Sequence, residues 1–122
     1  MTPRALSLFA LSLLFAGSAG AGCKSKDCEP LIAQSGDVQS ALGEFDLTKA
    51  KAGADAIAKD FAGRDPGEIA NLVRSAEALS RAIGPMQDKD VSVEDREEIR
   101  SDFDLASQNF ASARNDVRRV CE

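Results

Sequence analysis

The residues best able to do chemistry in this chain are its three cysteines, Cys23, Cys28 and Cys121. A thiol can form a disulfide, take an acyl chain or, as a thiolate, act as a nucleophile. Cys23 and Cys28 are five positions apart, whereas Cys28 and Cys121 enclose most of the remaining chain. Redox enzymes typically use a close Cys-x-x-Cys pair. The spacing here favours structural or anchoring roles over redox catalysis.

Other candidates for chemistry are weaker. The chain has no histidine, so it lacks the side chain that most often serves as a general base or metal ligand. In the acidic segment QDKDVSVEDREE, Asp88, Asp90 and Ser92 have the spacing of the first three ligands of an EF-hand calcium loop. However, Val93 replaces the loop glycine and Ile99 the final bidentate glutamate. We therefore predict that the protein is not an enzyme and holds neither a metal ion nor a cofactor.

The composition indicates one small acidic folding unit. The chain has 122 residues and a formal net charge of −5, from 15 basic and 20 acidic side chains. Hydrophobic residues make up 43% of it, which is enough for a core. A negative protein is repelled by nucleic-acid phosphates and by anionic membrane surfaces. We expect no nucleic-acid partner, and a basic protein is the better electrostatic match.

The first 22 residues have the layout of a secretory signal peptide. Arg4 supplies a positive start, residues 5–16 are apolar, and residues 17–22 are small. The apolar stretch has about twelve residues, fewer than the roughly twenty of a membrane-spanning helix. We therefore expect residues 1–22 to be removed, which leaves a mature chain of formal charge 14 − 20 = −6.

The segment "GAGC" at residues 20–23 resembles the lipobox of bacterial lipoproteins, in which small residues precede the cysteine that begins the mature chain. The lipobox usually carries leucine where Gly20 stands here. The resemblance implies that the Cys23 thiol carries acyl chains such as palmitate and anchors the protein in the cell envelope. In some lipoproteins of two-membrane bacteria, a residue other than Asp after the lipidated cysteine directs the protein to the outer membrane, and Lys24 resembles this pattern, which implies the periplasmic side of the outer membrane. The alternative is cleavage after Ala21, which would release a soluble periplasmic or secreted protein.

Lipidation of Cys23 would leave Cys28 and Cys121 as an even pair. Exported proteins meet an oxidising compartment, where an odd number of cysteines leaves one thiol unpaired. The resemblance therefore implies a Cys28–Cys121 disulfide. It divides the mature chain into a lipid-anchored tether, residues 23–27, and a folded domain, residues 28–122.

Apolar residues of the mature chain recur at the spacing of helices. The last predicted helix covers residues 93–120 behind the N-cap candidate Ser92, with arginines near its end to complement the helix dipole. Its apolar stripe consists of Ile99, Phe103, Ala106, Phe110, Ala113, Val117 and Val120. The preceding helix is expected to begin with Asp65 as N-cap and Pro66 at its first position, and to end at the Gly-Pro pair 84–85.

The first part of the domain is open to two interpretations. Residues 47–62 form a predicted helix that ends at Gly63. Residues 29–45 form either a separate helix, with Phe45 on its apolar stripe, or the start of one long helix in a three-helix bundle.

A disulfide would decide between these two folds. Four helices that run up and down bring Cys28 and Cys121 to the same end. A long straight first helix would put them at opposite ends, beyond the limit of about 7 Å between bridged α-carbons. We therefore predict an all-α, up-down bundle of four helices closed by one disulfide, with three helices as the alternative.

Together these features predict a non-catalytic envelope lipoprotein that acts as an interaction or structural module at the membrane surface. Its expected partners are the membrane, through the lipid anchor, and an envelope protein. The alternative function is a binder, either an inhibitor of an envelope enzyme or a carrier of an apolar ligand. A large apolar cavity would favour the carrier, and an exposed apolar groove on a helix pair would favour the partner module.

Overall fold

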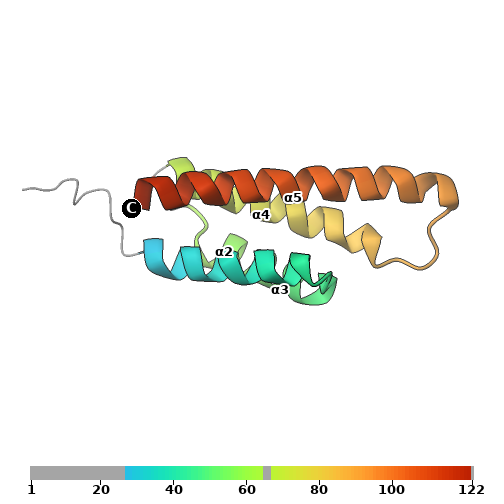
Figure 1. Cartoon of the computed structure of the whole chain (residues 1–122), viewed down its shortest axis with the longest axis horizontal. Coiled ribbons are helices and arrows are strands. Elements are labelled where there is room, and N and C mark those ends of the chain that lie inside the picture. Colours follow the sequence, from blue (N-terminus) through green and yellow to red (C-terminus); the bar gives the residue numbers. More distant parts are fainter. Residues whose placement is uncertain (1–26, 65–66, 122) are drawn as a thin grey trace, which may run out of the picture.

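The computed structural model describes residues 27–64 and 67–121, and these form four α-helices and no strand. The helices are α2 (Cys28–Gly43), α3 (Leu47–Asp60), α4 (Gly67–Met86) and α5 (Val93–Cys121). Figure 1 shows that successive helices alternate in direction along one long axis. The prediction of an all-α, up-down four-helix bundle is confirmed, and the three-helix alternative is wrong.

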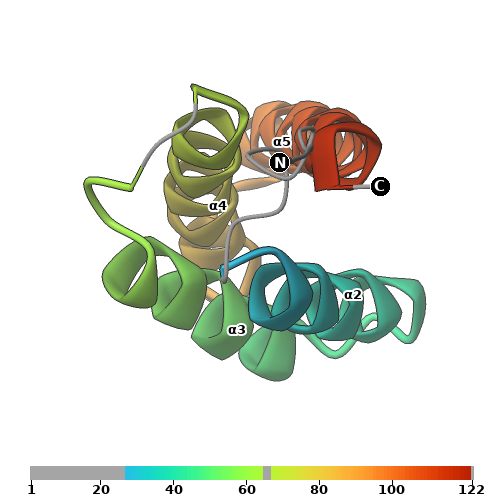
Figure 2. The same cartoon turned by 90° about the vertical axis from the view of Figure 1, so that its left-hand side faces the viewer.

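Each helix packs against its neighbours in the chain, and α5 returns beside α2 to close the ring (Figure 2). The contact between α2 and α5 is the least extensive of the four. Within residues 27–64 and 67–121, no helix combines the length and apolar character needed to cross a membrane.

The core is built from the apolar faces of all four helices. Its largest fully buried hydrophobic side chains are Leu31, Val38, Ile57, Ile69, Leu72, Leu79, Ile83, Phe110 and Val117. Buried alanines on every helix, such as Ala41, Ala54, Ala76 and Ala106, let the helix axes approach closely. Gly53 takes this furthest, because a β-carbon there would lie 2.7 Å from Cγ2 of Val38.

Local capping explains where two helices begin. The Asp46 side chain accepts a hydrogen bond from the Lys49 backbone nitrogen at 3.1 Å, which caps α3. The Ser92 hydroxyl accepts one from the Asp95 nitrogen at 3.2 Å, so the predicted cap of α5 is confirmed. The predicted cap of α4, at residues 65–66, lies outside the described residues.

The predicted end of α4 at residues 84–85 is wrong, because the helix continues to Met86. Proline destabilises a helix by removing a backbone donor and by crowding the preceding turn. Pro85 stands in the last turn, where few further bonds remain to be lost. The nitrogens of Gln87 and Asp88 then bond to the carbonyls of Gly84 and Pro85, both at 3.1 Å, and complete the end.

The prediction that Phe45 lies on the apolar stripe of a helix is wrong. Phe45 lies in the turn after α2. The Asp46 nitrogen bonds to the Ala41 carbonyl at 2.8 Å, and the Phe45 nitrogen to the Leu42 carbonyl at 3.0 Å. This pair of bonds is the Schellman motif, which ends a helix with one residue in the left-handed region. Phe45 occupies that position with φ 55°.

The disulfide joins the two ends of the described domain. The sulfurs of Cys28 and Cys121 are bonded, with their α-carbons 5.8 Å apart, and both residues are buried. The predicted pairing is therefore present in the structure. The opposite end of the bundle, with the α2–α3 turn and the α4–α5 loop, is called the distal end below.

Candidate functional site

The structure places the predicted site residues in two groups. Cys28 and Cys121 are brought together in the disulfide. Cys23, the predicted lipidation site, lies outside the described residues, as do the leader and residues 24–26 of the tether. Its lipidation therefore stays a prediction.

Unequal helix lengths leave the distal end partly uncovered. α2 has 16 residues and α5 has 29, and both have one end at the disulfide. The difference of 29 − 16 = 13 residues corresponds to about 20 Å of helix. Figure 1 shows the α4–α5 hairpin projecting past the α2–α3 turn. Apolar residues of this projection consequently lack a covering helix on the α2 side.

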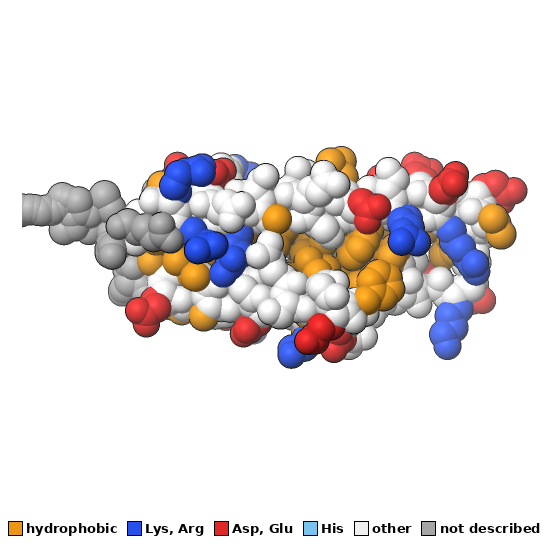
Figure 3. All heavy atoms as spheres, viewed as in Figure 1, with side chains coloured by type: hydrophobic (Ala, Val, Ile, Leu, Met, Phe, Trp, Pro, Cys, Tyr) orange, Lys and Arg blue, Asp and Glu red, His pale blue; other side chains and the backbone are white. Residues whose placement is uncertain are grey.

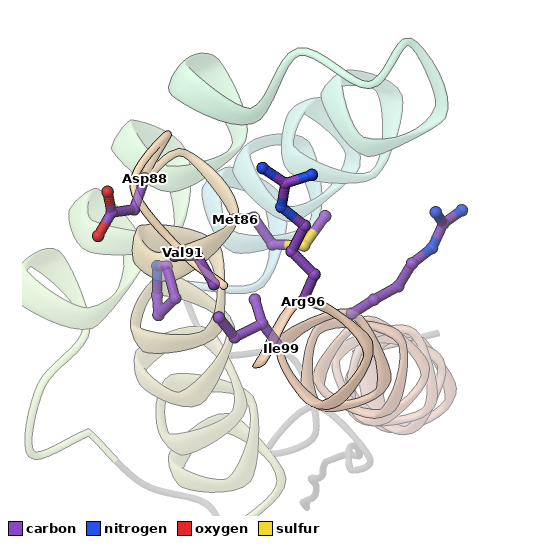
Figure 4. Close-up of a pocket in the computed structure, with 7 residues that line it drawn as sticks. Met86, Asp88, Val91, Arg96 and Ile99 are labelled. Atoms are coloured by element: carbon purple, nitrogen blue, oxygen red, sulfur yellow. The ribbon is translucent and has the colours of Figure 1, made fainter. Parts of the chain in front are cut away.

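A hollow of about 270 Å³, called the distal hollow below, lies between the end of α4 and the first turns of α5. It is lined by Pro85, Met86, Asp88, Val91, Arg96, Ile99 and Arg100. Figure 4 shows the Arg96 side chain reaching across this region, while the Asp88 side chain points away on the opposite side. The hollow thus combines an apolar floor with two arginines at its rim.

Phe45 extends this apolar surface onto the α2–α3 turn. Its ring packs edge-on against Phe103 of α5, with the ring centroids 6.3 Å apart, yet 59% of the residue is exposed. Phe103 follows Ile99 by one helical turn, so the ring pair adjoins the hollow. We call Phe45, Met86, Val91, Ile99 and Phe103 the distal strip. Figure 3 shows hydrophobic side chains gathered between α5 and α2 toward the distal end.

The backbone of Phe45 is strained for a side chain of its size. A left-handed conformation costs an L-residue about 1–2 kcal/mol, and the position of Phe45 in a Schellman motif is usually glycine. Such strain is concentrated at functional sites, where another requirement retains the residue. An exposed, strained aromatic ring is therefore a reason to regard the distal strip as a binding surface.

A second polar feature lies where α5 meets α2. The Arg114 guanidinium donates from Nε to Ser35 Oγ at 2.8 Å, and through its other nitrogens to Gln39 Oε1 and the Ile32 carbonyl, both at 3.2 Å. All three acceptors are uncharged. Burial lowers the pKa of Arg114, and the nearby charge of Arg118 lowers it further. Arg114 thus holds a partly desolvated positive charge between the two helices.

No group of three or more Cys, Asp or Glu residues within the described ranges is arranged to hold a metal ion. The Asp55 carboxyl accepts a hydrogen bond from Ser80 and pairs with Lys51, and these interactions lower its pKa. The Ser80 contact ties α3 to α4, whereas the ion pair with Lys51 lies within α3. Asp55 therefore acts in stability, and it lies away from the distal strip.

Sequence reasoning missed two features of the structure, the position of Phe45 in a turn and the reach of Arg114 to α2. It placed Phe45 on a helix, although a jump in the apolar phase before Leu47 already indicated a break there. It assigned the arginines near the end of α5 to the helix dipole, whereas Arg114 reaches across to α2. Nothing in the local sequence distinguishes Arg114 from Arg119, which pairs with Asp116 on the surface.

Comparison with models of known protein families, with curated proteins and with solved structures finds no match to this chain. The interpretation of the site therefore rests on its residues and geometry.

Proposed function

We propose that the protein is a non-catalytic lipoprotein of the bacterial envelope that holds a partner protein at its distal strip. The observation that carries this proposal is the exposed Phe45 ring, kept in a strained backbone conformation near a hollow that apolar side chains and two arginines line. Apolar surface of this kind marks contact sites, and aromatic residues dominate the binding energy of many interfaces. The resemblance of residues 20–23 to a lipobox supports the anchor.

The distal strip lies at the end of the domain opposite the disulfide. Cys23 precedes the disulfide by only five residues, so a lipid there would hold the disulfide end against the bilayer. Ile99 and Cys121 are 121 − 99 = 22 residues apart on α5, or about 33 Å. The distal strip would then face away from the membrane, where a partner can reach it.

The alternative of an apolar-ligand carrier has less support. The centre of the bundle is occupied by buried leucine, isoleucine and phenylalanine side chains and by closely packed alanines. Three hollows that the described residues line are open to solvent, and none of the three lies inside the ring of helices. A carrier would need an enclosed apolar chamber. The partner module is therefore the better fit.

Site-specific photo-cross-linking in cells tests the proposal. A photoreactive amino acid is placed at Phe45 or Ile99 in the full chain, and at Leu105 as the matched control. Leu105 is 58% exposed, close to the 59% of Phe45, but lies on the α4 side of α5. We expect one discrete cross-linked partner from positions 45 and 99 and none from 105. Equal labelling at all three positions, or none at any, contradicts the proposal.

A further inference from the structure

We infer that the segment bound by this protein is an acidic amphipathic helix, which lies along α5 between the distal hollow and Arg114. The inference rests on the proposed function and names the chemistry of the partner. Two observations carry it: a basic flank of α5 and an apolar stretch within that flank.

The basic flank follows from the helical repeat. At about 100° per residue, positions 96, 100, 107, 114 and 118 fall on the same side of α5. Arg114 bonds to residues of α2, so this side faces α2. Among the described residues, neither Arg96 nor Arg100 forms an ion pair. Figure 3 shows basic side chains on both sides of the apolar patch, one group toward each end of the bundle.

Two hollows mark the ends of the path. The distal hollow contains Arg96 and Arg100. The second, of about 560 Å³, is lined by Arg114 and by residues of α2, including Gly36 and Asp37. A β-carbon at Gly36 would lie 3.0 Å from Nη2 of Arg114, so the glycine leaves room around the guanidinium. A carboxylate in this hollow would give Arg114 the counter-charge that its three neutral acceptors do not supply.

The middle of the path holds an apolar ring pair, and the residue after Phe103 on α5 is the exposed Asp104. Phe103 and the ring of Phe45 lie between the two hollows along α5. Ser107, one turn further, has a buried hydroxyl oxygen with no hydrogen-bond partner among the described residues. Because this oxygen has almost no accessible surface, it offers no contact to a helix bound on the outside of the bundle.

The separation of the charges sets the pattern of the partner. Arg100 and Arg114 are 114 − 100 = 14 residues apart, or about 21 Å along α5. Fourteen residues make nearly four helical turns. A helix antiparallel or parallel to α5 could therefore present two carboxylates at this spacing with apolar residues between them. The mature chain is acidic overall, at 14 − 20 = −6, whereas the two hollows are lined by three arginines against two aspartates, Asp88 and Asp37.

Peptide binding tests this recognition directly. The probe is a fluorescein-labelled helical peptide of roughly 18 residues, with an apolar stripe and two glutamates fourteen residues apart. Matched peptides carry glutamine or lysine at those two positions. Binding to the exported full chain, purified in mild detergent, is followed by fluorescence anisotropy, and circular dichroism checks that each variant is folded.

We expect the glutamate peptide to bind saturably and about fivefold more tightly than the glutamine peptide. R100Q weakens the glutamate peptide and leaves the glutamine peptide unchanged. R100E favours the lysine peptide. D37N strengthens the glutamate peptide, because it removes a like charge from the second hollow. Arg81, exposed on the α4 side, supplies the control R81Q, which leaves all three affinities unchanged.

Equal binding of the three peptides, or preference of the unmodified protein for lysine, overturns the inference. Binding to phosphatidylglycerol vesicles that depends on Arg100, without binding of the glutamate peptide, shows a lipid surface instead. A dimer in sedimentation that R100Q dissociates shows a second copy as the occupant. A discrete cross-link at Phe45 combined with no peptide preference rejects only the acidic helix. Peptide binding without any cross-link rejects the proposed function.

Discussion

Replacing Phe45 with glycine or alanine separates the role of this residue in folding from its role in binding. Both variants lose the ring contact with Phe103, so the difference between them isolates the backbone. Phe45 has φ 55°, where a β-carbon is strained and glycine is not. We expect F45G to be more stable than F45A by about 1 kcal/mol. At an ordinary position glycine is the less stable residue, by roughly 0.5–1 kcal/mol.

The comparison with the unmodified chain follows from two opposing effects. Relief of strain in F45G stabilises the fold by about 1–2 kcal/mol, and loss of the aromatic pair costs about 0.5–1.5 kcal/mol. F45G should therefore stay within about 1 kcal/mol of the unmodified protein, while a partner bound through the ring is released.

Urea unfolding followed by circular dichroism at the helical band measures both differences. Circular dichroism is the appropriate signal because the chain has no tryptophan or tyrosine. F45A equal to or more stable than F45G would refute the left-handed assignment of this turn. Partner binding that survives F45G in full would refute the role given to the ring.

Three further predictions concern stability. The C28A/C121A variant should lose about 4–5 kcal/mol in urea unfolding, since the bridge closes a loop spanning 93 positions; reductant should destabilise the unmodified protein equally, and a loss below about 2 kcal/mol contradicts this role. G53A should destabilise by up to about 2 kcal/mol, because the overlap of the new methyl group with Val38 costs about 1–3 kcal/mol and the better helix propensity of alanine offsets about 0.5–1 kcal/mol of it. A thermal midpoint at or above that of the unmodified chain argues against this contact. D55N should destabilise the fold modestly at neutral pH. Because folding lowers the pKa of Asp55, the stabilisation by its carboxylate is present above the ordinary pKa of 3.8 and is lost as the pH falls through the folded pKa. A stability difference between D55N and the unmodified protein that is unchanged in strong acid would disprove this role.

The helices that the sequence specifies best are those whose signals are local. The stripe of α5 and the Ser92 cap both lie within one continuous segment, so periodicity and capping chemistry suffice to place them. The bundle topology followed from one long-range constraint, the pairing of Cys28 with Cys121. The rule that proline ends a helix failed at Pro85, because this residue lies in the final turn of α4, where proline is tolerated.

The proposed binding surface could not be predicted, because it depends on how the helices are placed relative to one another. The exposure of Phe45 results from a Schellman turn that puts a bulky residue where glycine is usual. The distal hollow is left uncovered because α5 is longer than α2 and extends past its end. This depends on the lengths of two helices relative to one another. Arg114 crosses to Ser35 only because α2 lies beside α5. None of these relations is contained in a local pattern.

The intact mass of the mature protein, extracted from membranes without reductant, tests the anchored module most directly. The account predicts a chain that begins at Cys23, carries acyl chains, and is lighter by two hydrogens for the Cys28–Cys121 bridge. A mass that begins at Gly22 without lipid would contradict the anchor. A mass that retains both hydrogens would contradict the bridge that holds the membrane end of the bundle together.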